Sequence, residues 1–245
     1  MEEVQNKFIT DVFIAEYDVD MYMNLKISSL LRHMQEVGSL HLESMGFSYD
    51  IMATRGYVYL LVNLHVVLYR QIKSHETIQF HTWVPKNSGF RTYRNFKMYD
   101  SDGNLACEAS TVWVLADVNT HKIVSLDKSP VDLRFNSEEK LGIADAKKIK
   151  VPQDMKQTSS RKVRYTDLDV NAHVNNSIYG DIFYDESGVD FSKYWISDFS
   201  INYRKEAIYG DIISIHSETK LPNVYLAGIV NDISSFEVLC KVSER

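Results

Sequence analysis

The sequence has few residues that interrupt secondary structure. Its 245 residues include only 10 glycines and 4 prolines, against 15 tyrosines and 11 phenylalanines. This balance argues against a disordered chain and favours long, well-packed strands. Cysteine is also scarce, because Cys107 and Cys240 are the only two, and each lies within an apolar run. Two such thiols indicate a reduced, intracellular protein rather than a disulfide scaffold.

Features that mark several other classes of protein are also missing. The net charge is −6 at pH 7, so the chain lacks the overall basic charge of a protein that binds nucleic acid or an anionic membrane. No apolar run approaches the length needed to cross a bilayer. The amino-terminal segment MEEVQNKFIT is too polar and acidic for a secretory signal. We therefore expect a cytoplasmic protein with neither nucleic acid nor membrane as a partner.

Motifs for metals, nucleotides and serine nucleophiles are absent from the sequence. The histidines show no metal-ligand spacing, and neither an HxxxH nor a CxxC pair occurs. A Gly-rich phosphate loop and a GxSxG elbow are missing as well. We therefore expect no metal and no cofactor.

The first half of the chain predicts one helix followed by strands. Apolar residues three and four positions apart predict a helix with one buried face over residues 27–42. Strand-like runs follow, and Asp102-Gly103 is a strong hairpin signal between the last two. These runs cover residues 56–69, 78–84, 91–99 and 105–116. The next stretch lacks periodicity and contains Pro130 and Pro152, which predicts a linker at residues 126–157.

The second half repeats this order of elements. A polar loop at residues 165–176 leads into a predicted helix at 177–186, and four strand-like runs follow. These runs cover residues 195–204, 211–219, 224–231 and 236–242. Two copies of loop, helix and antiparallel strands predict a tandem α+β architecture with units at 1–125 and 158–245. The alternative is a single irregular α+β domain.

The loop YTDLDVNAHVNNSIY, residues 165–179, is the most informative segment for chemistry. Asp169, Asn171 and His173 occupy alternate positions, so on an extended loop a carboxylate, an amide and an imidazole would face the same side. Asn175 and Asn176 then favour the start of a helix, whose free N–H groups are suited to polarise a carbonyl. The alternative is an Asx-rich turn with an incidental histidine.

The internal repeat provides a control for this interpretation. We align the loops on their first acid and the following strands on Tyr69-Arg70 and Tyr203-Arg204. The resulting pairs are Asp20 with Asp169, Tyr22 with Asn171, Asn24 with His173, and Ile72 with Glu206. The second copy thus carries two acids, an amide and an imidazole, whereas the first keeps only one acid. Because a purely structural need should apply to both copies, the difference favours chemistry in the second.

Four segments of the chain resemble the acyl-ACP thioesterase family of plant plastids and bacteria. LDVNAHVNNSIY is close to the signature loop of that family, and NYRKEA resembles its second catalytic strand. FHTWVPKNSGFRTYRNF and ASTVWVLADVNTHKI match its pattern in the first half.

The resemblance implies a double hotdog fold, in which an antiparallel sheet wraps a long helix twice. It also implies catalytic roles for Asp169, Asn171, His173 and Glu206. Plant members often have Cys directly after the glutamate, where this chain has Ala207, so no thiol nucleophile is available at that position.

The resemblance also implies a reaction and a partner. The expected reaction is hydrolysis of the fatty acyl phosphopantetheine thioester of an acyl carrier protein, which releases a fatty acid and terminates its synthesis. Asn171 and helix N–H groups would hold the carbonyl, and the unit of the first half would enclose the acyl chain. Glu206 or Asp169 would activate water with help from His173, or Asp169 would attack directly.

Several points stay open at the level of sequence. The resemblance implies that the carrier protein is acidic, so basic residues are candidates for docking it. They are Arg161, Lys162 and Arg164, or Arg91 with Arg94. Rival functions are an acyl-CoA thioesterase of the 4-hydroxybenzoyl-CoA type and a non-catalytic acyl-binding module. The fused double unit argues against the first, and the complete set of polar residues argues against the second. Both a monomer and a homodimer are compatible with the sequence.

Overall fold

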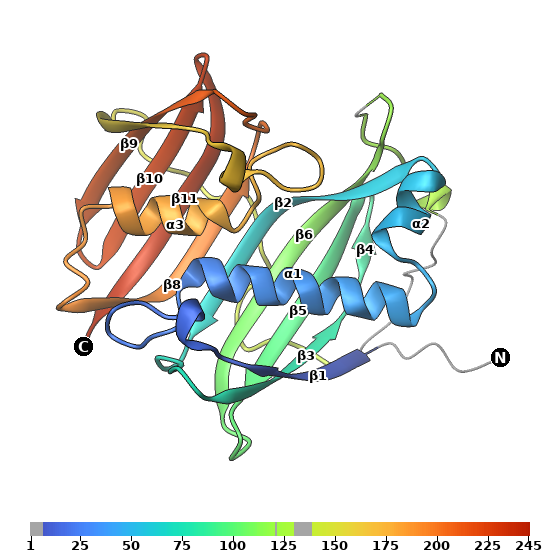
Figure 1. Cartoon of the computed structure of the whole chain (residues 1–245), viewed down its shortest axis with the longest axis horizontal. Helices are drawn as coiled ribbons and strands as arrows, with labels where there is room; N and C mark the ends of the chain where they lie inside the picture. Colours follow the sequence, from blue (N-terminus) through green and yellow to red (C-terminus); the bar gives the residue numbers. More distant parts are fainter. Residues whose placement is uncertain (1–6, 121, 130–138) are drawn as a thin grey trace.

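The protein is built on one continuous antiparallel sheet that curves around two helices (Figure 1). This description comes from a computed structural model and covers residues 7–120, 122–129 and 139–245. Within these residues eleven strands follow the order β1-β3-β5-β6-β2-β8-β11-β10-β9-β7, with β4 paired to β5. The first and second halves of the chain therefore contribute opposite halves of the sheet.

The amino-terminal unit combines six strands with two α-helices. Its long helix, α1, crosses the concave face of its half-sheet (Figure 1). The elements are β1 (Lys7–Phe13), η1 (Glu16–Asp18), α1 (Ile27–Ser44), α2 (Tyr49–Thr54), β2 (Tyr57–Leu68), β3 (Thr77–Trp83), β4 (Asn87–Ser88), β5 (Arg91–Tyr99) and β6 (Leu105–Asp117). A short turn, η2 (Leu126–Lys128), follows β6. The sequence predicts neither β1 nor α2, because β1 is a half-exposed edge strand and α2 is too short to show periodicity.

The carboxyl-terminal unit repeats the arrangement with a shorter helix. Its elements are β7 (Lys156–Lys162), η3 (Tyr165–Asp167), α3 (Ile178–Glu186), β8 (Tyr194–Tyr203), β9 (Ile212–Lys220), β10 (Asn223–Val230) and β11 (Ile233–Glu244). The predicted double hotdog fold is thus confirmed, but the two helices differ. α3 has 9 residues and α1 has 18. α3 ends just before Gly188, whose φ of +71° a helix cannot accommodate.

The two half-sheets join where β2 pairs with β8. The pairing runs for five rungs, from Asn63 opposite Asn202 to Val67 opposite Asp198. On the concave side, fully buried rings such as Phe80, Phe96 and Phe199 form part of a hydrophobic core that continues through both units. This continuity makes the two repeats one packed body.

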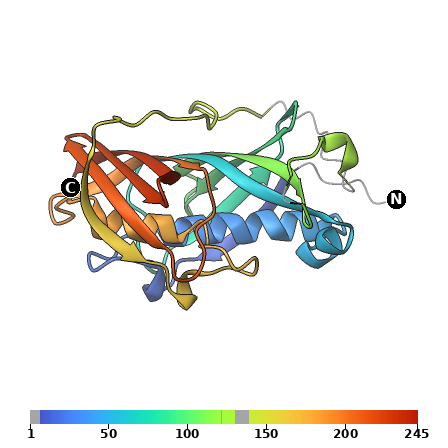
Figure 2. The same ribbon diagram turned by 90° about the horizontal axis from the view of Figure 1, so that it is seen from above.

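Residues 139–155, which precede β7, run along the face of the sheet opposite the helices (Figure 2). Three polar contacts fix them there. The Glu108 carboxylate accepts the Gly142 N–H at 3.0 Å, and the His65 ring bonds to the Ala144 carbonyl at 2.9 Å. The Asn202 side chain bonds to both the N–H and the carbonyl of Ile149, at 3.0 and 3.1 Å. β7 begins at Lys156, so the predicted linker of residues 126–157 overlaps this strand by two residues. Pro130 lies outside the described residues.

No helix in the described part of the chain has the length and apolarity to span a membrane.

The two helices touch through a glycine. A Cβ atom on Gly180 of α3 would lie 3.0 Å from the Ile27 side chain and 3.0 Å from the Ser28 backbone nitrogen of α1. The neighbouring backbone cannot easily yield, so we expect Gly180→Val to lower the free energy of unfolding by about 1–3 kcal/mol through overpacking.

The matched control is Gly38→Ala on α1, where the nearest atoms to an added Cβ are in the flexible Arg94 side chain, at 3.6 Å. This change should be neutral or raise the free energy of unfolding by up to about 1 kcal/mol, because alanine favours helix. Urea denaturation measures both values. Equal effects of the two substitutions would contradict this description of the helix contact.

Candidate active site at the start of α3

The loop that precedes α3 is a tight turn organised by Asp169. The Asp169 carboxylate accepts the backbone N–H groups of Asn171 at 2.8 Å and His173 at 3.3 Å. Leu168 and Val174 form an antiparallel bridge, and Ala172 adopts a φ of +60°. The extended conformation assumed for this loop is therefore wrong, because the chain reverses direction here. The turn nevertheless directs Asp169, Asn171 and His173 to the same cavity.

The first copy builds the same turn with its own acid. The Asp20 carboxylate accepts the N–H groups of Tyr22 at 2.8 Å and Asn24 at 2.9 Å. Val19 and Leu25 form the corresponding bridge, and Met23 has a φ of +64°. Thus the acid that both copies share stabilises the loop, and the residues that differ between copies carry the difference in chemistry.

Glu206 lies beside this turn because the segment after β8 pairs with it. Val174 donates its N–H to the Ala207 carbonyl at 2.9 Å, and His173 forms a bridge with Ile208. The side chains of His173 and Glu206 have no hydrogen-bond partner among the described residues, and Glu206 is exposed. Both are therefore available to a substrate or to water.

The structural counterpart of Glu206 is Gln71, rather than Ile72 as the repeated Tyr-Arg pair suggests. In the first copy Leu25 donates its N–H to the Ile72 carbonyl at 2.8 Å, so Ile72 corresponds to Ala207. The Asn24–Lys73 bridge confirms this register. The alignment from sequence is wrong by one residue, but the conclusion stands, because the first copy has an amide where the second has an acid.

Asn171 is oriented by a residue from the other unit. The Tyr49 hydroxyl, at the start of α2, donates to the Asn171 side-chain oxygen at 2.5 Å. With its oxygen occupied, the amide presents its NH₂ group as the available donor. Sequence reasoning missed Tyr49, since nothing in the local pattern connects it to a loop more than a hundred residues away.

The start of α3 supplies a further donor. The Asn175 side-chain oxygen accepts from the Ser177 N–H at 2.9 Å and from its hydroxyl at 2.7 Å, and the Asn175 N–H bonds to the Asp167 carbonyl. Between them, the Asn176 N–H has no acceptor among the described residues. The Tyr203 hydroxyl donates to the carbonyl of the same residue, Asn176, at 3.2 Å, and Asn176 lines the cavity.

All four predicted site residues line one cavity of about 400 Å³. Its remaining wall comes mostly from the amino-terminal unit, through α1, α2, β2, β5 and β6. Asn171 and Glu206 are exposed and His173 is half-buried, so the polar residues lie at the mouth of the cavity. The Gln35, Leu61 and Trp113 side chains continue it into the amino-terminal unit.

The equivalent position in the first copy is closed. The cavity beside Asp20, Asn24 and Gln71 measures only about 20 Å³, and Tyr184 and Phe191 of the other unit line it. Several charged contacts occupy the space that a ligand would need. Lys73 Nζ donates to Asn24 at 2.5 Å and to Gln71 at 3.2 Å, and the Arg245 guanidinium lies 4.4 Å from the centre of the Tyr22 ring.

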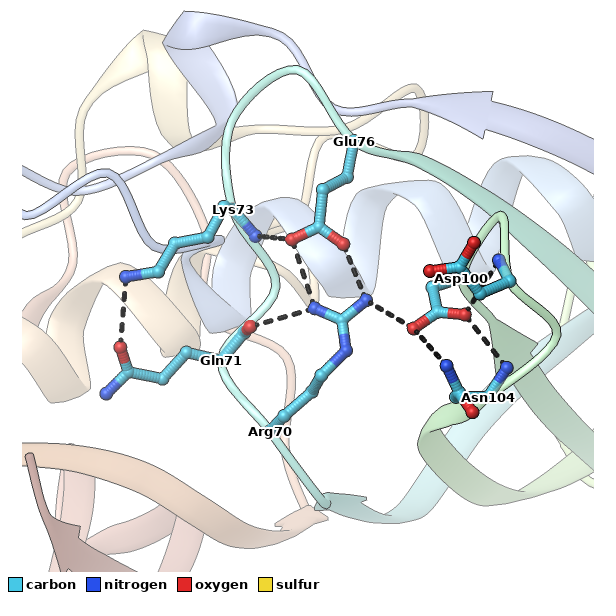
Figure 3. Close-up of polar contacts among 7 residues, drawn as sticks. Arg70, Gln71, Lys73, Glu76, Asp100 and Asn104 are labelled. Atoms are coloured by element: carbon cyan, nitrogen blue, oxygen red, sulfur yellow. Dashed lines mark hydrogen bonds and ion pairs between the residues drawn. The ribbon is translucent and has the colours of Figure 1, made fainter.

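An ion-pair network fixes the segment that carries Gln71 (Figure 3). The Arg70 guanidinium bonds to both oxygens of Glu76, at 3.0 and 2.5 Å, and to Asp100 at 3.3 Å. The Glu76 carboxylate also accepts the Lys73 N–H at 2.6 Å. These contacts raise the pKa of Arg70, chiefly through its hydrogen bonds to Glu76. The charged residues around the first loop thus stabilise the fold of this segment.

Tyrosines behind the polar residues remain neutral at pH 7. Burial, reinforced by the negative charges of Glu206 and Asp169, raises the pKa of Tyr179 to about 12. Burial also raises the pKa of Tyr203. Their hydroxyl groups therefore act as hydrogen-bond donors and not as bases.

Two of the basic residues considered for docking are already engaged. Arg94 is only 6% exposed and donates to the His41 ring at 2.9 Å, so it cannot contact a protein partner. Arg161 pairs with Asp167 at 2.8 Å. Lys162, Arg164 and Arg91 are exposed.

The paired helix-and-sheet units, with an open cavity beside one polar loop and a closed cavity beside the other, define a double hotdog protein. The chain belongs to the acyl-ACP thioesterase family. Residues 5–133 match the family model described as acyl-ACP thioesterase N-terminal domain, and residues 150–240 match the acyl-ACP thioesterase C-terminal domain.

Plant proteins are among its relatives. The acyl-[acyl-carrier-protein] hydrolase FATB2, chloroplastic, of Cuphea viscosissima is 26% identical over 179 residues, which cover 68% of this chain and 43% of that protein. Oleoyl-acyl carrier protein thioesterase 2, chloroplastic, of Arabidopsis thaliana is 22% identical over 238 residues, which cover 89% of this chain and 64% of that protein. The chain thus spans about half to two thirds of the length of these relatives.

Solved structures share the fold. An acyl-ACP thioesterase from Bacteroides thetaiotaomicron superposes with a TM-score of 0.89 at 22% identity, over 97% of this chain and 98% of that one. The 12:0-ACP thioesterase from Umbellularia californica superposes with a TM-score of 0.81 at 18% identity, over 100% of this chain and 99% of that one.

The equivalent roles of Asp20 and Asp169 are testable by their effect on stability. Asp20→Ala and Asp169→Ala each remove the acceptor of two backbone N–H groups, so each should lower the free energy of unfolding by about 1–3 kcal/mol. Asp169→Asn keeps an oxygen at the same place and should cost less. Chemical denaturation gives the three values. An Asp169→Ala protein as stable as the wild type would show that this carboxylate does not organise the loop.

Proposed function

We propose that the protein hydrolyses the thioester between a fatty acyl group and the phosphopantetheine of an acyl carrier protein, which releases the fatty acid and terminates its synthesis. One observation carries this proposal. Two acids, an amide and an imidazole lie at the mouth of a cavity of about 400 Å³, whereas the matching position of the twin unit is closed to about 20 Å³. Family membership supports the same reaction.

We assign the carbonyl-binding role to Asn171 and the start of α3. The free NH₂ group of Asn171 and the N–H of Asn176 both face the cavity mouth and would donate to the thioester oxygen. Donors placed in advance are most effective where negative charge develops, as on the oxyanion of a tetrahedral intermediate. The Tyr49 hydroxyl acts by positioning Asn171.

Glu206 is the favoured base for activating water. Asp169 already accepts two backbone N–H groups, which makes it a poorer nucleophile and base, whereas Glu206 has no such partner among the described residues. In this scheme Glu206 removes a proton as the water oxygen bonds to the carbonyl carbon. The intermediate then collapses with cleavage of the carbon–sulfur bond. His173 orients the water, and protonated Glu206 passes its proton through His173 to the departing thiolate, which regenerates the Glu206 carboxylate. The thiolate needs little help to leave, because thiols have a pKa of ~8.5.

The position of the cavity indicates how the two ends of the substrate would lie in the site. The acyl chain would lie between α1 and the sheet of the amino-terminal unit, where most of the wall is located. The phosphopantetheine arm would then leave past the exposed residues Asn171 and Glu206. Lys162 and Arg164, exposed at the end of β7, stay candidates for contacting the acidic carrier protein.

A cytoplasmic location stays a prediction. The division into units at 1–125 and 158–245 and the choice between monomer and homodimer stay predictions as well.

The experiment is a thiol-release assay on acyl-ACP and on the matching acyl-CoA. The wild type should hydrolyse acyl-ACP faster than acyl-CoA. Glu206→Gln should lower kcat by about 100- to 10,000-fold, because it removes the general base while keeping the shape of the side chain. His173→Ala should also lower kcat, by roughly 100-fold or more.

The control is Gln71→Ala, which truncates the structural counterpart of Glu206 in the closed copy and should leave kcat unchanged. Near-normal turnover by both Glu206→Gln and His173→Ala would overturn the assigned roles. No turnover of any thioester by the wild type would overturn the proposed reaction in favour of acyl binding.

Tyr49→Phe tests the positioning of Asn171 from the other unit. Loss of this hydroxyl frees the amide to rotate, so kcat should fall by about 2- to 10-fold, the worth of one neutral hydrogen bond. KM should change little, since Asn171 acts mainly on the developing oxyanion. The result would count against the assignment if KM rose and kcat stayed constant.

A further inference from the structure

Deep in the cavity lies an arginine that has no carboxylate partner. Arg94, on β5, is 6% exposed and lines the same cavity as the four polar residues at its mouth. Its Nη1 donates to His41 Nδ1 at 2.9 Å and to Thr82 Oγ1 at 3.2 Å. No other hydrogen bond or ion pair joins its guanidinium to a described residue. Since a guanidinium has five N–H donors, most of its hydrogen-bonding capacity is unused.

The guanidinium keeps its charge in this environment. Burial lowers the pKa of Arg94 to about 10, so the group is still protonated at pH 7. The His41 ring accepts from it through Nδ1, which a protonated imidazole cannot do, so His41 is neutral. Among the described residues, no carboxylate lies within ion-pair distance of the Arg94 guanidinium itself. Burying a charge without a counter-charge is costly, and such a group is typically retained for a ligand.

Arg94 and the acids at the mouth belong to different units of the chain, because Arg94 lies on β5 and Glu206 follows β8. Asp169 and Glu206 are the only acidic residues that line the cavity among the described residues. One row of rungs joins Arg94 to Thr111, Thr111 to Leu64 and Leu64 to Ile201, and Ile201 belongs to the strand that leads to Glu206. That row crosses three strand spacings, so the Arg94 backbone lies ~14 Å along the sheet from Ile201, five residues before Glu206. An acyl chain that starts at Glu206 would meet Arg94 with its remote part.

The surrounding residues leave space for this guanidinium. Gly38, in the middle of α1, lines the cavity opposite Arg94, and a Cβ there would lie in ordinary contact with Arg94 Cδ and Nε, at 3.6 Å. The small residue therefore leaves the space next to the Arg94 side chain open. The Tyr59 hydroxyl and Thr92 add polar groups to the same part of the wall.

We propose that Arg94 selects acyl groups that carry an oxygen acceptor in the part of the chain remote from the thioester, such as a hydroxyl or a carboxylate. The inference rests on the proposed function, because it identifies the class of acyl group for the same cavity. A plain alkyl chain would leave the guanidinium desolvated and without an acceptor, whereas an oxygen atom would satisfy it. Arg94 is therefore a specificity-determining residue.

Binding of free acids tests this inference without requiring turnover. The probes are dodecanoic acid, monohydroxydodecanoic acids with the hydroxyl moved along the distal half of the chain, and dodecanedioic acid, each titrated into the full-length protein. At least one oxygenated acid should bind about 10- to 100-fold more tightly than dodecanoic acid, as expected for a hydrogen bond to a charged group. Arg94→Met should abolish this preference, and Arg94→Lys should retain part of it.

Arg32→Met is the matched control, because it removes an exposed arginine of α1 that pairs with Asp181 outside the cavity. It should leave the preference unchanged. Tighter or equal binding of dodecanoic acid by the wild type would overturn the inference, whatever the folding of the Arg94 variants.

Thiol release from the matching acyl-ACP thioesters separates the two proposals. Faster release of the oxygenated acyl group supports both. A binding preference without release of either acyl group supports the selection by Arg94 and overturns hydrolysis. Release without preference overturns the inference alone.

Discussion

The pairing of β2 with β8 is the constraint on which both the fold and the site depend. Five rungs join the two half-sheets, and the pairing stops at Asn63 opposite Asn202. The preceding part of β2 pairs only with β6, and its residues from Val58 to Val62 line the open cavity. The strand that unites the two units therefore also forms the wall against which the polar loop of the second unit opens.

This arrangement makes each loop depend on the opposite unit. The second loop faces α1, α2 and β2 of the amino-terminal unit and is left with a cavity of about 400 Å³. The first loop faces the shorter α3 and the segment after it, where Tyr184 and Phe191 leave about 20 Å³. One turn, stabilised by an acid in both copies, thus supports an open site in one and a closed core in the other.

Much of the fold could be predicted from the sequence, because the periodic elements are long. The helix expected at residues 27–42 is α1, and the expected strands correspond to β2, β3, β5, β6 and β8 to β11. The strands β1, β4 and β7 and the helix α2 could not be found, since none has a pattern long or apolar enough. The choice of Ile72 in place of Gln71 had a different cause. The residue that pairs with the loop is Ile72 in the first copy, two positions after Arg70, and Ala207 in the second copy, three positions after Arg204. This difference of one residue is visible only in the backbone pairing.

The residues of the candidate site that belong to a sequence motif or to the internal repeat could be predicted. The residues that reach the site only through tertiary structure could not. Asp169, Asn171, His173 and Glu206 follow from a motif and a repeat. Tyr49 reaches Asn171 from the other unit, so no local pattern could indicate it. Arg94 was expected among surface cations because arginine is rarely buried, and only the packing of α1 over β5 places it inside the cavity.

The most direct test of this account is a crystal structure of the Glu206→Gln protein bound to an acyl-pantetheine amide, in which nitrogen replaces the thioester sulfur. The amide carbonyl should accept hydrogen bonds from the Asn171 NH₂ group and the Asn176 N–H, with the acyl chain between α1 and β5. A chain bound in the carboxyl-terminal unit, or a carbonyl remote from Asn171, would contradict it.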